Sequence, residues 1–363
     1  MATIFLTGYP GFLGSELLPR ILARKAGARA LCLVQSKFLA LAEQRRQLLF
    51  EAHPGLEGRI ELVEGDITRP GLGLPANGAL RENVEEVYHL AALYDLGLSR
   101  HLGMRINVDG TRHTLDFASD CPGLKRFHYV STCYVSGRHC GIYTEQDLDR
   151  GQPFNNYYEE TKFLAEIEVQ SRMRGGLPTT IYRPSIVTGD SHSGATQKFD
   201  GPYFFIQWLL RQPRMAAVMP VVGDPTATRV NLVPRDYVTD AMAYLSGLEQ
   251  SASRVYQLAD PEPLTADRLI DEVARATERH IVRVPVPLGV TKAALRHLPA
   301  ISRLVRIPPD VVDYFSHPTH YTTDNTTADL KGSGIELPRL TSYLHRLVHF
   351  MRENPQAGMG AMA

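Results

Sequence analysis

The feature that most constrains this chain is a turn with regularly spaced glycines, a few residues from its start. Apolar residues 4–6 read as a strand and apolar positions through Leu22 read as a helix, with the turn between them. In such a turn the glycines allow a tight reversal, a close approach of the backbone to a pyrophosphate, and close packing of helix on strand. The free N–H groups at the helix start also favour an anion. The sequence therefore predicts a dinucleotide-binding turn formed by Thr7, Gly8, Gly11, Phe12, Leu13 and Gly14.

Short apolar runs recur along the first 190 residues, with helical patterns between them. They lie at residues 30–34, 60–63, 87–90, 127–131 and 180–183. Continuous apolar strands that alternate with helices are typical of a parallel sheet covered on both faces. We therefore predict an α/β fold with a Rossmann-type, doubly wound parallel sheet, and a ligand site beyond the carboxyl ends of its strands.

The pattern loosens after Pro184. Small and polar residues crowd positions 188–202, which indicates an active-site loop, and strand-like runs return at 229–233 and 255–258. We predict that residues 1–190, with later strands from about 229–260, form a dinucleotide-binding Rossmann domain. Residues 191–228 and 261–363 would form a smaller, mainly helical substrate-binding subdomain.

Charge and cysteine content exclude several classes of protein. Lys plus Arg equals Asp plus Glu, 39 each, so no bulk charge favours nucleic-acid binding. The four cysteines form no C-x-x-C pair, and we expect reduced thiols.

We see no signal peptide and no apolar run long enough to span a membrane, and we expect a cytoplasmic protein. His317 and His320 do not form a metal-binding pattern with nearby aspartates, so no metal is expected.

The end of the second strand bears on the choice of nicotinamide cofactor. An acidic residue there would bind the ribose 2′-hydroxyl of NAD, but the chain continues with Gln35, Ser36 and Lys37. These residues could meet a 2′-phosphate, which favours NADP(H); the alternative is a solvated polar turn. After the third strand, Asp66 and Ile67 are expected at the adenine, although Asp66 fits a turn or helix cap equally well.

Tyr158 and Lys162 are four residues apart and would share one face of a helix. A nearby ammonium lowers the pKa of a phenol from about 10 toward working pH, so Tyr158 could exchange a proton beside a carbonyl. Thr132 ends the fifth strand, and its hydroxyl could hold the same carbonyl oxygen. Asn107 is expected at a helix start, where an N-cap is the alternative role.

Six motifs resemble those of the extended short-chain dehydrogenase/reductase family, in the same order and over about the first 190 residues. They are Thr7-Gly8-x-x-Gly11-Phe12-Leu13-Gly14, His89-Leu90-Ala91-Ala92, Asn107-Val108-x-Gly110-Thr111, Val130-Ser131-Thr132, Tyr158-x-x-x-Lys162 and Arg183-Pro184-Ser185-Ile186-Val187-x-Gly189. The resemblance implies an NAD(P)-dependent oxidoreductase in which Tyr158 is the general acid and Lys162 its tuner. It gives Thr132 the third catalytic hydroxyl and Asn107 an orienting role. It also implies cofactor contacts at Ala91, Ala92, Pro184, Ser185, Ile186 and Val187.

Residues 11–14, 181–191 and 198–205 carry a narrower resemblance. They are similar to the thioester-reductase branch, which includes fatty acyl-CoA reductases and the terminal reductase domains of carboxylic acid reductases and peptide synthetases. The N-terminal half of bacterial alcohol-forming fatty acyl-CoA reductases is most similar. The branch often has Arg where this chain has Gln35.

Two apolar segments could belong to the substrate side. Residues 201–210 could form a wall for an acyl chain or an ordinary core helix, and residues 288–306 could form a lid over an apolar tunnel, a membrane-surface helix or a plain surface helix. We predict an NADPH-dependent reductase of a long-chain acyl thioester or fatty aldehyde, with the substrate free or carrier-protein-bound and the enzyme a monomer or homodimer. The alternatives are another carbonyl or hydroxyl dehydrogenase, an NAD-dependent sugar-nucleotide epimerase or dehydratase, and a non-catalytic NADP-binding protein.

Overall fold

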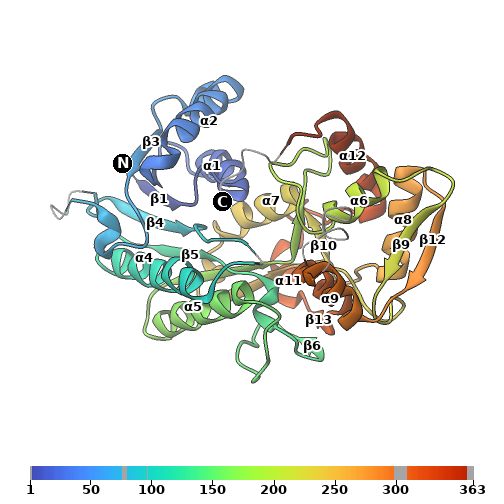
Figure 1. Ribbon diagram of the computed structural model, residues 1–363. Coiled ribbons are helices and arrows are strands. Elements are labelled where there is room, and N and C mark those ends of the chain that lie inside the picture. The colour runs from blue at the N-terminus through green and yellow to red at the C-terminus, as the bar shows by residue number, and fades with distance from the viewer. Residues whose placement is uncertain (1, 76–79, 96, 298–308, 358–363) are drawn as a thin grey trace.

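A seven-stranded, fully parallel sheet forms the centre of the computed structural model (Figure 1). The structure describes residues 2–75, 80–95, 97–297 and 309–357. The spatial order of the strands is β3-β2-β1-β4-β5-β7-β11, which confirms the predicted doubly wound sheet. The strands are β1 (Thr3–Thr7), β2 (Arg29–Val34), β3 (Ile60–Glu64), β4 (Val84–His89), β5 (Arg126–Val130), β7 (Thr179–Pro184) and β11 (Arg254–Leu258).

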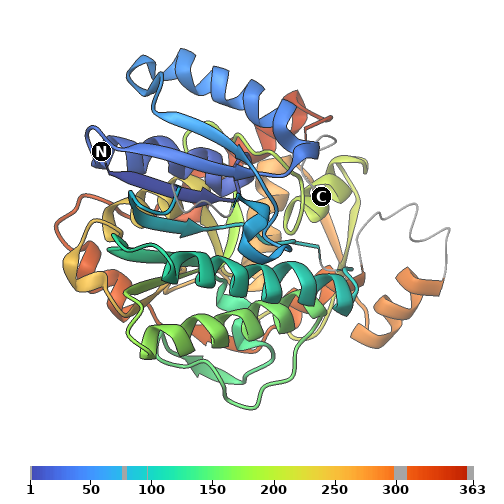
Figure 2. The same ribbon diagram turned by 90° about the vertical axis from the view of Figure 1, so that its left-hand side faces the viewer.

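Helices cover both faces of this sheet because its strands are apolar on both sides. Ile4 faces a core shared with Ile21, on the side of α1, α2 and α7, whereas the adjacent Phe5 faces a core shared with Leu115 and Val169, on the side of α4 and α5. Figure 2 shows α4 and α5 side by side on their face. The helices are α1 (Phe12–Arg24), α2 (Leu39–Ala52), α3 (Arg100–Gly103), α4 (Gly110–Ser119), α5 (Tyr157–Arg174), α6 (Tyr203–Leu210), α7 (Arg235–Leu245), α8 (Ala266–Thr277), α9 (Leu288–His297), α11 (Asp324–Leu330) and α12 (Leu340–Glu353).

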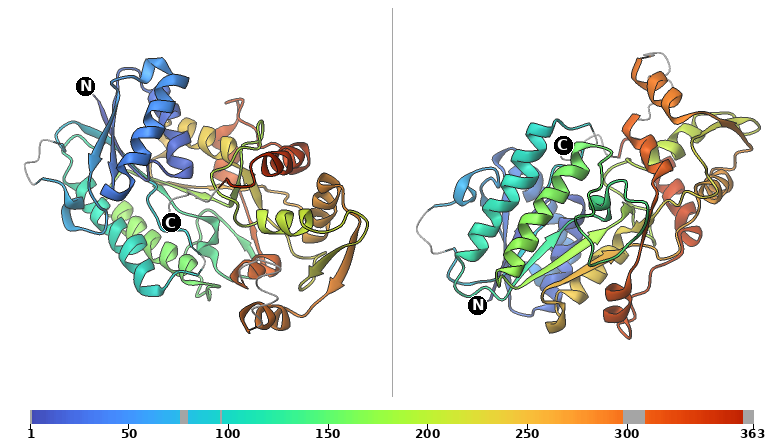
Figure 3. Two further views of the ribbon diagram at one scale, coloured as in Figure 1. Left: turned by 45° about the horizontal axis from the view of Figure 1, so that its top comes forward. Right: turned by 90° about the horizontal axis from the view of Figure 1, so that it is seen from below.

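A second apolar core lies at one end of the sheet, where α6, α8, α12 and the β9–β12 pair gather in both views of Figure 3. Three two-stranded parallel ladders join distant parts of the described chain outside the central sheet. They are β8 (Ile186–Thr188) with β10 (Leu232–Pro234), β9 (Ala217–Val221) with β12 (Ile281–Pro285), and β6 (Gly141–Tyr143) with β13 (Thr319–Tyr321).

The later strands differ from the sequence expectation in one respect. Of the two runs expected to extend the Rossmann sheet, only β11 joins it, whereas the run at 229–233 becomes β10 and pairs with β8 outside the sheet. The amphipathic segment at 288–306 begins as α9, and residues 298–306 lie outside the described part of the chain. No helix in the described ranges is long and apolar enough to cross a membrane.

The order of the sheet reverses at β1, which has β2 on one side and β4 on the other. In a doubly wound sheet this reversal opens a crevice at the carboxyl ends of the strands, because the connections leave in opposite directions. The glycine turn lies there, between β1 and α1. The fold therefore places a ligand site at the carboxyl ends of β1, β4, β5 and β7.

Candidate active site

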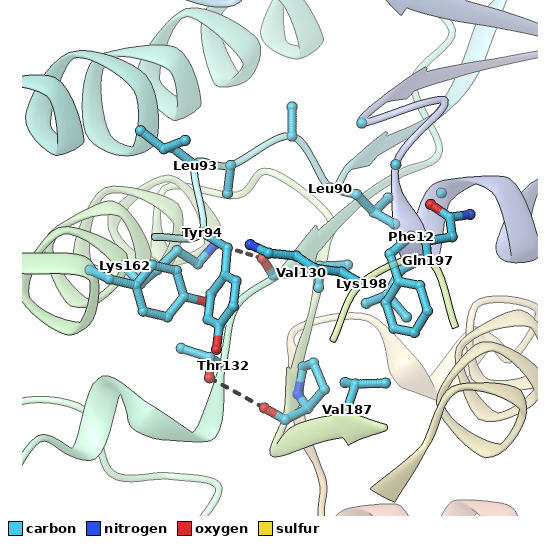
Figure 4. A pocket seen from close by; sticks show the side chains of 18 of the residues that line it. Phe12, Leu90, Leu93, Tyr94, Val130, Thr132, Lys162, Val187, Gln197 and Lys198 are labelled. Carbon is cyan, nitrogen blue, oxygen red and sulfur yellow. Dashed lines mark hydrogen bonds between the residues drawn. The ribbon is translucent and has the colours of Figure 1, made fainter. Parts of the chain in front are cut away.

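A cavity of about 430 Å³ occupies this crevice, and its wall combines nearly all of the predicted site residues (Figure 4). The predicted residues in the wall are Thr7, Gly8, Gly11, Phe12, Leu13, Gly14, Gln35, Lys37, Ile67, Ala91, Ala92, Thr132, Tyr158, Lys162, Pro184, Ser185, Ile186 and Val187. Ser36, Asp66 and Asn107 do not line it. Figure 4 shows Thr132, Lys162 and Tyr94 on one side of the cavity and Phe12 on the other.

The glycine turn has the shape that a dinucleotide pyrophosphate requires. Gly8 has a φ of +93°, and a Cβ on it would lie 2.8 Å from the backbone nitrogen of Ala91. A Cβ on Gly14 would lie 2.5 Å from the carbonyl oxygen of Gly8. Helix α1 begins at Phe12 with no side-chain cap and no acidic residue in its first turn. Its free N–H groups and positive dipole end therefore suit an anion, and the turn fits NAD(P).

Thr7 and His89 connect this turn to the next strand. The Thr7 hydroxyl lies 2.7 Å from Nδ1 of His89 and accepts a hydrogen bond of 3.2 Å from the backbone N–H of Ala91. Burial lowers the pKa of His89 to about 3, so its imidazole is neutral. The other ring nitrogen lies 2.9 Å from the Thr111 hydroxyl. This buried chain fixes β1 against β4 and α4 and holds the segment that carries Ala91.

The residues expected around the adenosine separate into two groups. Gln35 and Lys37 line the cavity, whereas the Ser36 hydroxyl donates to the Glu64 carboxylate instead. Asp66 accepts a hydrogen bond of 2.8 Å from the backbone N–H of Thr68, two residues further on. Burial raises its pKa, but the bonds from Thr68 and Gln35 outweigh burial and leave that pKa below its usual value. Of the two roles open for Asp66, the geometry therefore favours the turn.

Thr132 and Tyr158 reach the cavity from the starts of two helical segments. Thr132 caps the short 3-10 helix Cys133–Ser136 by accepting from the backbone N–H of Tyr134 at 3.3 Å. Tyr158 lies in the first turn of α5, which Asn156 caps by accepting from the backbone N–H of Glu159 at 3.0 Å. The Thr132 hydroxyl donates to the carbonyl of Pro184 at 3.3 Å, and Thr132 and Tyr158 both line the cavity. Local capping thus fixes the two backbone segments from which Thr132 and Tyr158 reach the cavity.

Lys162 lies one helical turn beyond Tyr158 but is directed elsewhere. Its ammonium donates to the Tyr129 hydroxyl at 2.9 Å and to the carbonyl of Val130 at 2.7 Å. Burial lowers the pKa of Lys162 to about 7, although the Glu166 carboxylate opposes this. Burial also raises the pKa of Tyr158, and the Thr132 hydroxyl only opposes it. The expectation that Lys162 lowers the Tyr158 pKa is therefore wrong for this structure, because desolvation dominates.

Asn107 lies inside a helical stretch, and the expected helix start there is wrong. The stretch begins at Arg100, where Ser99 caps α3, and Asn107 falls in the π-helical segment Met104–Asp109 that joins α3 to α4. Its side chain accepts from the backbone N–H of Leu93 at 2.8 Å and donates to the carbonyl of Leu93 at 3.3 Å. It also donates to the Thr161 hydroxyl at 3.1 Å. Asn107 thus holds a cavity-lining loop from behind.

The sequence reasoning missed several aromatic and charged residues in the cavity wall. The ring of Tyr94 meets that of Tyr158 edge-on, with centroids 5.0 Å apart. Lys198 reaches across the cavity, with Nζ 5.5 Å from the Tyr94 ring and 3.7 Å from the Asp200 carboxylate (Figure 4). Tyr94 could have been found because it lies just after the Ala91-Ala92 motif. The Lys198–Asp200 pair lies at the end of the predicted active-site loop.

Tyr314 and Glu159 form a second group that the sequence reasoning missed. Tyr314 lines the cavity from the 3-10 helix Pro309–Ser316, and its hydroxyl accepts from Asn156 at 3.2 Å. Burial raises the pKa of Glu159 to about 7, and hydrogen bonds from Asn155 and Tyr314 only partly offset this. Nothing local marks Tyr314, which lies more than 150 residues after Tyr158 in the chain. In the described ranges, no group of three or more His, Cys, Asp or Glu side chains is placed to hold a metal ion.

Three comparisons connect this geometry with known proteins. Residues 6–242 match the NAD-binding family described as "Male sterility protein". The chain is 31% identical over 278 residues to a component of the linear gramicidin synthase of Brevibacillus parabrevis, covering 73% of this chain and 5% of that protein. It is 28% identical over 241 residues to the fatty acyl-CoA reductase wat of Drosophila melanogaster, covering 55% of this chain and 46% of that protein. The chain thus spans less than half of either curated relative.

A solved structure extends the similarity over nearly the whole chain. The terminal R domain from the myxalamid PKS-NRPS biosynthetic pathway superposes with a TM-score of 0.82 at 28% identity. The superposition covers 98% of this chain and 92% of that domain. The similarity therefore includes both the central sheet and the C-terminal elements that close the cavity.

Proposed function

This chain belongs to the male sterility protein family and is an NAD(P)-dependent oxidoreductase of the extended short-chain dehydrogenase type, and from that premise we propose that it uses NADPH to reduce a long-chain acyl thioester or the matching fatty aldehyde. The observation that carries this proposal is that Thr132 and Tyr158 line the same cavity as the glycine turn. Two hydroxyls beside a nicotinamide site suit the reduction of a carbonyl.

The proposed chemistry assigns each part of the carbonyl to a residue of the chain. The hydroxyls of Thr132 and Tyr158 hold the carbonyl oxygen from two sides and stabilise the charge that develops on it. When bound, the reduced nicotinamide supplies the hydride to the carbonyl carbon. Tyr158 then gives its phenolic proton to the oxygen. Because burial raises the Tyr158 pKa, this residue retains its proton in the resting site and acts as the acid.

The two substrate classes differ only after this proton transfer. Protonation of the oxygen of an aldehyde completes an alcohol. With a thioester the same transfer gives a hemithioacetal, which releases the thiol and leaves an aldehyde. Lys162 donates to the carbonyl of Val130 at the end of β5. This bond links α5, which carries Tyr158, to the strand end that precedes Thr132.

The choice of NADPH rests on the end of β2. Gln35 and Lys37 line the cavity there, and no acidic side chain lines it beside them among the described residues. Lys37 could pair with a 2′-phosphate, whereas Ser36 is already engaged by Glu64. The matched test compares NADPH with NADH in the wild type and in Lys37→Gln. We expect Lys37→Gln to weaken the binding of NADPH but not of NADH, and equal losses of affinity for both cofactors would contradict the assignment.

The preference for an apolar substrate over a sugar nucleotide rests on the apolar part of the cavity wall. Leu93, Tyr94 and Tyr314, which lie outside the predicted cofactor residues, contribute apolar surface that suits an acyl chain better than a polyhydroxylated sugar. Helix α6, the apolar run considered as an acyl wall, packs most of its aromatic face into the second core. The resemblance to the R domain also favours the reductase over an epimerase.

NADPH consumption with dodecanoyl-CoA, and separately with dodecanal, tests the proposed function directly. Turnover of the thioester supports a thioester reductase, and its product shows whether reduction stops at the aldehyde. Turnover of dodecanal alone restricts the enzyme to the second reduction. If neither compound is reduced although NADPH still binds, the proposal is overturned. Delivery of the thioester by a carrier protein, the division into a cofactor domain and a substrate subdomain, a monomeric or dimeric state and a cytoplasmic location remain predictions.

A further inference from the structure

A second cavity of about 190 Å³ lies beneath α9, within the C-terminal core. Its wall is almost entirely apolar, with Met219, Val221, Ile270 and Leu295 among the lining side chains and no charged residue. An apolar cavity of about 150 Å³ already accepts a guest the size of benzene. The volume and chemistry of this second cavity therefore suit a hydrocarbon segment of several carbons and offer nothing to a phosphate or sugar.

Two segments of the chain line both cavities. At the start of α6, Pro202 borders the catalytic cavity and Phe205 borders the second one. In the 3-10 helix Pro309–Ser316, Tyr314 borders the catalytic cavity and Val312 borders the second one. Pro202 and Phe205 lie three residues apart, about 4.5 Å along a helix, and Val312 and Tyr314 lie two residues apart, so the two cavities adjoin the same short segments. No residue of the glycine turn lines the second cavity.

Helix α9 forms the outer wall of the second cavity. Val290 and Ala294 are four residues apart, line the cavity together and so define one face of the helix. Ala293 lies on the exposed face. The Lys292 ammonium pairs with the buried Asp313 carboxylate at 2.7 and 2.9 Å and fixes α9 to the 3-10 helix that carries Val312. For α9, the described part of the segment at 288–306, the contacts thus favour a helix that covers an apolar space.

We propose that this second cavity receives the distal end of the substrate's acyl chain while the carbonyl lies at Thr132 and Tyr158. This inference rests on the proposed function. It adds to that function a site that selects the length of the acyl chain. A short chain would end within the catalytic cavity. A longer chain would pass Pro202 and Tyr314 and bury its terminal methylenes against Phe205, Val312 and the inner face of α9. Each methylene buried in this way improves kcat/KM by up to about fourfold.

A pair of adjacent alanines on α9 provides the test. Ala294→Trp places an indole in the second cavity, whereas Ala293→Trp adds the same side chain to the exposed face of the same helix. The measurement is kcat/KM for butanal, octanal, dodecanal and hexadecanal, and for the matching acyl-CoA esters, in both variants and the wild type. We expect Ala294→Trp to lose about tenfold or more on the long chains, the equivalent of two or more displaced methylenes. Butanal should be reduced normally, and Ala293→Trp should match the wild type at every length.

Unaltered chain-length dependence in Ala294→Trp, with normal NADPH binding to show a folded enzyme, would overturn the inference and leave the proposed function intact. A thermal-shift titration with 1-dodecanol gives a readout that does not require turnover. Stabilisation of the wild type and Ala293→Trp, but not of Ala294→Trp, supports occupation of the cavity. If the wild type reduces none of the compounds, the proposed function fails and the cavity is overturned as a substrate site, whatever 1-dodecanol does.

Discussion

Asn107 accepts a hydrogen bond of 2.8 Å from the backbone N–H of Leu93 and returns one of 3.3 Å to the carbonyl of the same residue. Leu93 lines the catalytic cavity just after Ala91 and Ala92, whereas Asn107 is buried behind it in a π-helical segment. One side chain thus satisfies both backbone groups of a loop residue that lacks regular partners. The π-helical segment supplies the geometry, because the extra residue in its turn directs Asn107 toward the loop.

Replacing Asn107 with Ala should release this loop. The Leu93 N–H would lose its partner, which costs about 1–3 kcal/mol of unfolding free energy. We expect chemical denaturation to show that loss and a fluorescence titration to show weaker NADPH binding. Thr161→Val is the matched comparison, since it removes the bond from Asn107 to the Thr161 hydroxyl, together with the bonds of that hydroxyl to the carbonyls of Tyr157 and Tyr158, but leaves both Asn107 bonds to Leu93. NADPH affinity equal to the wild type in Asn107→Ala would contradict the positioning role.

Tyr158→Phe should abolish most turnover while it preserves the site. The variant lacks the hydroxyl that holds the carbonyl oxygen and supplies its proton, and general acid catalysis alone contributes about 100-fold to 10,000-fold. We expect kcat to fall within that range and NADPH affinity to remain. Tyr157→Phe is the matched control, because the neighbouring Tyr157 is about half exposed and does not line the cavity. Equal activity in Tyr158→Phe and the wild type would exclude Tyr158 as the acid.

The central sheet could be predicted from sequence because each strand is marked by local apolar residues. The runs at 30–34 and 60–63 correspond to β2 and β3 within one residue. The small ladders could not be predicted in this way. β9 contains Pro220 and depends on β12, which lies 60 residues further along the chain. Such pairs form only because the folded C-terminal core brings their partners together.

The same distinction applies to the candidate site. The glycine turn, Thr132 and Tyr158 lie in motifs whose spacing is fixed by one strand or helix, so the sequence indicates them. Tyr314 reaches the cavity only through the packing of a distant 3-10 helix. The direction of Lys162 and the raised pKa of Tyr158 depend on burial, which no local pattern encodes.

Glu159 should make stability depend on pH. Burial raises its folded-state pKa from 4.5 to about 7, so the folded protein binds more protons than the unfolded chain between these values. The contribution of Glu159 therefore makes stability fall as pH rises from about 4.5 to 7, by up to about 3 kcal/mol. Glu159→Gln removes this titration. We expect the difference in unfolding free energy between variant and wild type to shift in favour of the variant across that range, and a constant difference would contradict the assignment.

Loss of the buried ion pair between Arg183 and Glu166 should lower the free energy of unfolding far more than loss of an exposed ion pair. Both side chains are fully buried, and Arg183 donates to Glu166 at 2.6 and 3.0 Å. Glu166→Gln leaves the guanidinium without its counter-charge, which costs about 3–5 kcal/mol. Glu160→Gln is the matched comparison, since Glu160 pairs with the exposed Arg100 and should cost less than about 1 kcal/mol. Urea unfolding of both variants measures the contrast, and equal losses would contradict it.

Gly14→Ala should remove cofactor binding with little effect on the remainder of the fold. The new methyl group would lie 2.5 Å from the carbonyl oxygen of Gly8, a backbone atom that cannot move without reshaping the turn. Gly55→Ala is the matched control, because a Cβ there has no neighbour within 4 Å and its φ is not positive. We expect isothermal titration to show lost NADPH binding in Gly14→Ala and unchanged binding in Gly55→Ala. Circular dichroism of both variants should retain the wild-type spectrum. Wild-type NADPH affinity in Gly14→Ala would mean that the dinucleotide does not lie on this turn.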